Sequence, residues 1–172
     1  MQTFLSKSLL VSGIALGTAF SGGNASADSA STLHWQSVIG IVQGNNVIGS
    51  GTGAATGAPG PWSALGGHVN VDLDDGKINF VVRGLVLAGG NSIGTPGAVL
   101  QVKGTLVCDT DGSASGNSVL VDAPLVELDD QGNARFSGHV GSLPAVCTSE
   151  PDVAFLIRTG SGRWIGNGAV LR

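Results

Sequence analysis

The 172-residue chain is rich in glycine, with 29 residues, and carries 8 basic and 12 acidic side chains. The basic residues occur singly along the sequence, whereas binding to a phosphate backbone depends on grouped lysines and arginines that release counterions. The sequence therefore predicts no nucleic-acid partner, and it disfavours anionic membrane surfaces for the same reason.

Residues 1–27 have the pattern of a cleaved secretory signal. Lys7 precedes the apolar stretch Leu9–Phe20, and an A-x-A cleavage site follows at residues 25–27. The apolar stretch is too short to span a bilayer core of about 30 Å, and no later segment is apolar for long enough. We expect an exported protein without a membrane span, located in the periplasm, at the cell surface or in the extracellular medium.

Residues 28–172 are expected to form one domain with a net charge of −5, from 7 basic and 12 acidic side chains. Glycine recurs between short apolar runs, a rhythm typical of all-β proteins with many turns. The sequence predicts a single-domain antiparallel β-sandwich or barrel of eight or nine short strands, with little helix. The predicted strands are Ser37–Gln43, His68–Leu73, Lys77–Ala88, Ala98–Cys108, Ser118–Val121, Leu125–Leu128, Ala134–Val140, Val153–Arg158 and Arg163–Leu171.

Three stretches depart from this rhythm. Val81–Gly90 and Val153–Arg158 are apolar nearly throughout, which predicts central strands covered on both faces. Residues 44–62 are glycine-rich and uncharged, which predicts a long mobile loop anchored by Trp62. This loop lacks the lysine of a phosphate-binding loop and does not open a helix, so we expect no nucleotide and no other cofactor.

The two cysteines, Cys108 and Cys147, are both in the exported part of the chain. An even count in an oxidising compartment predicts one disulfide, the alternative being two buried thiols. A metal site at the cysteines would need further ligands, and His34, His68 and His139 show no metal-ligand spacing. We therefore predict the disulfide and no metal at the cysteines.

The sequence Leu-Asp-Asp occurs twice, at residues 73–75 and 128–130. Paired carboxylates would suit general acid–base catalysis if the two turns were neighbours, but adjacent residues of a strand face opposite sides of a sheet. Asp75-Gly76 is a strong two-residue hairpin signal, and residues 130–133 are similar to it. We interpret both as turns, and as a hint of internal pairing between two similar hairpins.

Residues 109–113 begin like a calcium-binding loop, with Asp109 and Asp111 as oxygen ligands. The helix-loop-helix calcium motif requires glycine at its sixth position and glutamate at its twelfth, where Ala114 and Leu120 stand. That motif is absent. A looser metal site at Asp109 and Asp111 stays an alternative to a solvated turn.

No serine lies in a G-x-S-x-G elbow and the cysteines are assigned to a disulfide, so the sequence predicts no catalytic residues. For ligand binding, Trp164 is the preferred exposed anchor for a sugar ring or a protein, with Trp62 as a second candidate. Arg158 and Arg163 flank the turn before Trp164, where they could hold an anion. The alternative is that each tryptophan fills the core.

The stretches VVRGLVLAGGNSIGT (Val81–Thr95), VKGTLVC (Val102–Cys108) and VAFLIRTGSGRWIGNGAV (Val153–Val170) resemble a group of small exported bacterial β-proteins without an assigned activity. The order of strand, Asp-Gly turn, strand and Gly-Leu at Val69–Leu85 is similar to CHRD-type secreted domains, although the His-x-His of that family has no counterpart here. Neither resemblance implies an activity or a site residue.

These features predict a secreted, non-catalytic β-domain that binds an extracellular glycan or protein, or has a structural role at the cell surface or in a matrix. One alternative is an extracellular enzyme acting on polysaccharide, with Asp109, Asp111, His139 or Arg163 converging in a groove. Another is a matrix protein that self-assembles through an uncovered strand edge.

Overall fold

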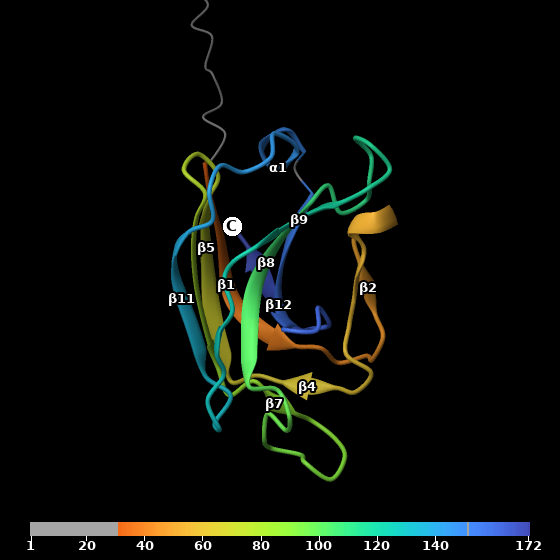
Figure 1. Ribbon diagram of the computed structural model, residues 1–172, viewed down its shortest axis with the longest axis vertical. Helices are drawn as coiled ribbons and strands as arrows, with labels where there is room; N and C mark the ends of the chain where they lie inside the picture. The colour runs from red at the N-terminus through yellow and green to blue at the C-terminus, as the bar shows by residue number, and fades with distance from the viewer. Residues whose placement is uncertain (1–30, 151) are drawn as a thin grey trace, which may run out of the picture.

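The computed structural model describes residues 31–150 and 152–172, and its regular secondary structure consists almost wholly of short strands joined by turns and loops (Figure 1). The predicted signal peptide lies outside the described residues. The strands are β1 (Thr32–Gly40), β2 (Val47–Ile48), β3 (Ala55–Thr56), β4 (Trp62–Ser63), β5 (Gly66–Asp72), β6 (Lys77–Arg83), β7 (Val86–Leu87), β8 (Gln101–Cys108), β9 (Val119–Asp122), β10 (Val126–Glu127), β11 (Ala134–His139), β12 (Val153–Thr159) and β13 (Trp164–Leu171). Two helical turns accompany them, η1 (Gly51–Gly53) and α1 (Val146–Ser149).

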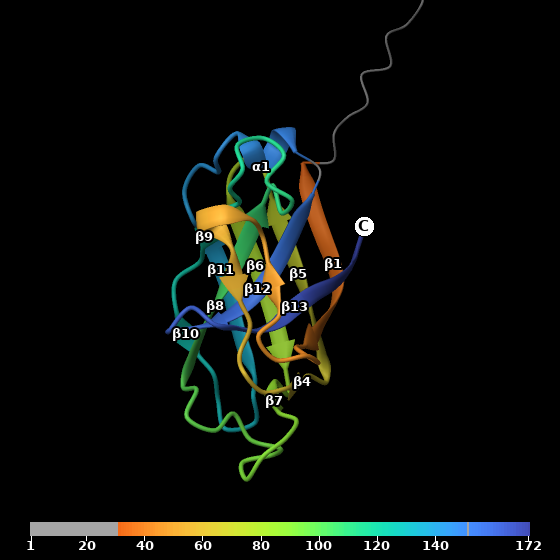
Figure 2. The same ribbon diagram turned by 90° about the vertical axis from the view of Figure 1, so that its right-hand side faces the viewer.

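One antiparallel sheet dominates the fold, with the strand order β10-β8-β12-β13-β1-β5-β6-β11 and with β9 paired to β8. The sheet curls, so that β12 lies in front of β5 and β6 in Figure 2. Its two terminal strands, β10 and β11, are consecutive in the chain but are not paired with each other. We call the opening between β10 and β11 the seam.

The core lies between the two layers of this curled sheet. Phe80 of β6 and Phe155 of β12 meet there with ring centroids 6.0 Å apart, and Trp35 lies 5.8 Å from Phe155. Gly104 of β8 leaves room for both phenylalanines, because a Cβ atom at this position would come within 2.5 Å of Phe155 and 2.8 Å of Phe80. The position therefore excludes any larger residue without a shift of the two rings.

The predicted all-β class and the predicted strands from β5 to β13 are confirmed, with Gly84 and Leu85 separating β6 from β7. β12 is buried at three consecutive residues, as expected of a covered strand. The expectation that Val81–Gly90 is covered on both faces is wrong, because β6 alternates between buried and outward residues. The expected loop at residues 44–62 contains the β2–β3 hairpin and η1, which sequence periodicity missed because each element has only two or three residues.

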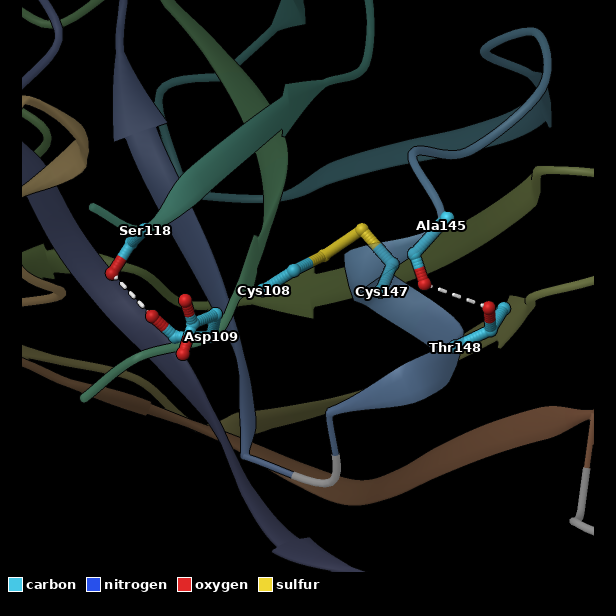
Figure 3. The surroundings of a disulfide bond; sticks show 6 residues. All are labelled: Cys108, Asp109, Ser118, Ala145, Cys147 and Thr148. Atoms are coloured by element: carbon cyan, nitrogen blue, oxygen red, sulfur yellow. Dashed lines mark hydrogen bonds between the residues drawn. A yellow bond between two sulfur atoms is a disulfide. The ribbon is translucent and has the colours of Figure 1, made fainter. Parts of the chain in front are cut away.

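The predicted disulfide is confirmed between Cys108, the last residue of β8, and Cys147 in α1 (Figure 3). The two Cα atoms lie 4.9 Å apart across a sequence separation of 39 residues. The bond holds α1 against one end of the sheet. In the chain-entropy account, closing a loop of this length stabilises the fold by about 4 kcal/mol.

Candidate functional site

The tryptophans predicted as exposed anchors are buried, so that prediction is wrong for Trp164 and Trp62, whose side chains expose 3% and 5% of their surface. Trp164 is covered by the glycine-rich stretch predicted as a loop. Its Nε1 donates a hydrogen bond to the Asn46 carbonyl at 3.1 Å, and Gly57 forms a bridge with Trp164 itself. These two tryptophans therefore fill the core, and neither offers its ring for stacking on a ligand.

The two arginines beside Trp164 are also engaged within the fold. Arg158 donates from Nη1 to Asp122 at 3.1 Å and from Nε to the Gly162 carbonyl at 2.9 Å. Arg163 donates to the Gly57 carbonyl at 3.2 Å. Asp122 already neutralises Arg158, so the anion site predicted at this turn from sequence is left with Arg163 alone and stays a prediction.

Asp122 is the centre of a small ion cluster on β8, β9 and β12. Its second carboxylate oxygen pairs with Lys103, and Thr105 donates to Asp122 at 2.6 Å. Burial alone raises the pKa of Asp122, but the bonds from Lys103 and Thr105 and the charge of Arg158 outweigh burial and hold the pKa below its usual value of 3.8.

The predicted metal loop forms a cluster of three carboxylates, because Asp152 joins Asp109 and Asp111 with ligand oxygens within 4.8 Å of one another. The fold itself uses these groups. Asp109 is fully buried and accepts hydrogen bonds from Ser113 and Ala114, while Ser118 donates to its carbonyl at 2.7 Å (Figure 3).

Asp152 of the same cluster accepts bonds from the Thr110 hydroxyl at 3.1 Å and from the Asp111 amide at 2.9 Å. The Asp111 amide is the main cause of the lowered pKa of Asp152. Oxygen clusters of this kind suit calcium chemically. The loop is fully explained by its own hydrogen bonds, so the geometry favours the interpretation as a turn.

The first Leu-Asp-Asp sequence is a tight turn between β5 and β6, as predicted. The Asp72 carboxylate accepts from the Asp74 amide at 3.0 Å, and Asp75 accepts from the Lys77 amide at 2.7 Å. The Lys77 amide is the main cause of the lowered pKa of Asp75. The hydrogen bond between the Asp75 carboxylate and His139, at 3.2 Å, lowers this pKa further.

The second Leu-Asp-Asp sequence is also a turn, but it joins β10 to β11 across the seam. Asp129 accepts from the amides of Gln131 and Asn133 at 2.9 and 2.8 Å, and from the Asn133 side chain at 3.0 Å. The Asn133 amide is the main cause of the lowered pKa of Asp129. Because β6 and β11 are antiparallel, the two turns lie at opposite ends of this strand pair, so the suggested internal pairing of the two hairpins is not found.

The outward faces of β1, β5, β6 and β11 carry mostly polar side chains and belong to adjacent strands, and we call them together the polar face. Its central row consists of His34, Asn70, Asn79 and Ser137, which are cross-strand partners in successive strands. His34 Nδ1 lies 2.6 Å from the side-chain oxygen Oδ1 of Asn70, and the Ser137 hydroxyl donates to Oδ1 of Asn79 at 2.5 Å. The row therefore presents imidazole, amide and hydroxyl groups on one surface.

The polar face also gathers basic residues that are distant in sequence. Lys77 and Arg83 point outward from β6, Arg135 from β11, and Arg172 lies beside His34 through a pair of backbone hydrogen bonds. Among residues 31–150 and 152–172, no ion pair involves any of these four cations. They are four of the seven basic residues that follow the predicted signal.

All three histidines belong to the polar face as well. His34 is on β1, His68 on β5 and His139 on β11, and the last two are exposed, as the sequence predicted. His68 belongs to a second row, with Val81 and Arg135 as its successive partners.

A cavity of about 450 Å³ opens at the seam, next to the polar face. We call it the seam pocket. A smaller cavity of about 330 Å³ lies along β6 and β11 and shares Val81 and Arg135 with it. The seam pocket is lined by Val81, Val82, Arg83, Val126, Glu127, Asp129, Asn133, Ala134 and Arg135.

The residues named for the enzymatic alternative do not converge. Asp109 and Asp111 lie together at the disulfide end, while His139 pairs with Asp75 and Arg163 bonds to Gly57. None of these four candidates lines the seam pocket or the cavity beside it. The geometry therefore lacks the shared groove that this alternative requires.

Comparisons with family models, with curated proteins and with solved structures found no match to this chain. Within the part of the chain that the structure describes, none of the helices has the length and apolar character needed to cross a membrane. The assignment of a site therefore rests on the geometry of the polar face and the seam pocket.

Proposed function

We propose that the protein is an exported, non-catalytic binding domain, and that its polar face binds an extracellular polysaccharide bearing acidic groups. The observation that carries the proposal is that one face of this acidic protein groups three histidines with four cations that form no ion pair with another described residue. Complementary charge raises the rate and specificity of association with a partner of opposite sign.

The shape of the polar face suits a polymer better than a small substrate. Neighbouring strands lie about 4.8 Å apart and outward residues recur about every 7 Å along a strand, so the side chains form a regular, gently twisted grid. Imidazole, amide and hydroxyl groups in this grid can donate to or accept from sugar hydroxyls. Lys77 and Arg135, at different heights on the grid, are available for acidic groups along a chain.

The distribution of acidic residues also favours the polar face as the surface that binds an acidic polymer. Asp72 and Asp75 occupy the turn end of the face, where both are used by turn hydrogen bonds. Asp109, Asp111 and Asp152 lie at the disulfide end of β8 and β12, away from the outward side of β6. An acidic polymer is therefore attracted to the middle of the polar face, where the outward residues of β6 and β11 include no acidic side chain.

A retention assay tests this proposal. The protein without residues 1–27 is passed over beads that carry polygalacturonate, dextran sulfate or uncharged dextran, at increasing salt concentration. We expect retention on at least one of the acidic polymers and none on dextran, with elution as salt screens the charges.

The matched pair Lys77→Gln and Arg163→Gln makes the assay specific. Each substitution removes one exposed charge, but only Lys77 lies on the polar face. We expect Lys77→Gln to elute at lower salt than the unmodified protein and Arg163→Gln to elute unchanged. Equal behaviour of the two variants, or no retention on either acidic polymer, would overturn the proposal.

A further inference from the structure

We infer that the seam pocket binds a carboxylated sugar residue, so that the polymer recognised by the polar face is a polyuronate. This inference rests on the proposed function and specifies its ligand class. It follows from the kinds of charge that line the pocket and from how each charge is already used.

The cationic side of the seam pocket is formed by Arg83 and Arg135. Val81 is the cross-strand partner of Arg135, and Arg83 is two residues farther along β6, so the two arginines are diagonal neighbours about 7–8 Å apart on one face. Both are exposed. A guanidinium group binds a carboxylate through two parallel N–H donors, a geometry that a lysine does not provide.

The opposite side of the seam pocket is acidic. The Asn133 amide and side chain hold the pKa of Asp129 below its usual value, so this carboxylate is ionised at neutral pH. Glu127 is exposed on β10 and forms no ion pair with another described residue. These two carboxylates repel a densely anionic ligand, but they accept hydrogen bonds from hydroxyl groups.

The pocket thus favours a ligand with one anionic group and several hydroxyl donors. A uronic acid residue has this composition on a single ring, with its carboxylate for the arginines and its hydroxyls for Glu127 and Asp129. A heavily sulfated sugar has few free hydroxyls and presents negative charge toward Glu127. The charges of the pocket therefore select carboxylated over sulfated chains.

The remaining wall of the seam pocket is apolar. Val82 and Ala134 are buried, and Val81 and Val126 are half-buried, so they offer aliphatic surface to the C–H side of a sugar ring. The volume of about 450 Å³ lies within the range of about 300–1,000 Å³ that small-molecule sites occupy. A sugar unit at the seam continues directly onto the polar face, because Val81 and Arg135 belong to both.

Titration calorimetry with hexagalacturonate tests this inference, with neutral galactohexaose and a sulfated oligosaccharide as comparison ligands. We expect hexagalacturonate to bind more tightly than either comparison ligand. Arg83→Gln should weaken its binding about 10-fold, through loss of a charged hydrogen bond. Arg163→Gln should leave the affinity unchanged.

Glu127→Gln separates the pocket from the polar face. Removing this carboxylate should raise the affinity for the sulfated oligosaccharide severalfold, while hexagalacturonate gains less. Equal affinity of the unmodified protein for carboxylated and sulfated ligands, or no effect of either Arg83→Gln or Glu127→Gln, would overturn the inference. Polymer retention that still depends on Lys77 would then leave the proposed function in place, whereas loss of that dependence would remove both.

Discussion

The two layers of the curled sheet treat their basic residues in opposite ways. In the layer of β8, β9 and β12, Lys103 and Arg158 share the carboxylate of Asp122. In the layer of β6 and β11, Arg83 and Arg135 point to solvent without an ion pair among the described residues. A basic side chain whose charge is paired within the sheet is unavailable to a ligand, whereas a basic side chain without an ion pair is available.

The largest expected effect on stability concerns the disulfide at the end of β8. Replacing both cysteines, Cys108→Ser with Cys147→Ser, should lower the free energy of unfolding by about 2–5 kcal/mol, because the unfolded chain is no longer constrained. Urea denaturation measures this change. The double variant, where it is folded, should still be retained on acidic polymer, because the polar face does not include the disulfide. Loss of retention by the folded variant would show that the two layers are not independent.

A smaller effect is expected at the ion cluster. Asp122→Asn removes the charged partner of Lys103 and Arg158 and should lower the free energy of unfolding by about 1–2 kcal/mol. This is less than the cost of breaking a fully buried ion pair, because the Asp122 side chain is 38% exposed and solvent screens its charge. Thermal denaturation checks the change. Polymer binding should be unaffected.

The pH dependence of this effect provides its control. The pKa of Asp122 is lower in the folded state, so its contribution to stability is fully present above about pH 4 and is lost as the pH falls through the lowered pKa. The difference in stability between the unmodified protein and Asp122→Asn should therefore shrink below pH 4. A difference that stays constant down to pH 2.5 would mean that the carboxylate charge is not its source.

Much of the fold could be predicted from sequence because alternating burial is a local property. In β11 the outward positions of Arg135, Ser137 and His139 follow directly from period two, and the cysteine count predicted the disulfide. The β2–β3 hairpin could not be predicted, because two-residue strands carry no period. The burial of Trp164 depends on that hairpin, so the preferred anchor was wrong for the same reason.

The candidate site was missed because it depends on strand order. Lys77, Arg135 and Arg172 are isolated in the sequence, and only the sequence of neighbours β13-β1-β5-β6-β11 brings them onto one face. Strand order follows from long-range packing, which no local pattern encodes. The one available signal was the set of polar outward positions in β5, β6 and β11, which could be read as a shared face only once the strands were known to be adjacent.

The double variant Arg83→Gln with Arg135→Gln tests most directly whether the unpaired cations of the polar face bind the polymer. Its affinity for polygalacturonate and its melting temperature are both measured. We expect an affinity at least about 10-fold lower than that of the unmodified protein, because two charged hydrogen-bond donors are lost, with an unchanged melting temperature. Asp122→Asn should show the reverse, a lower melting temperature with unchanged affinity. Undiminished binding by the arginine double variant would contradict the claim that the unpaired cations of the polar face form the binding site.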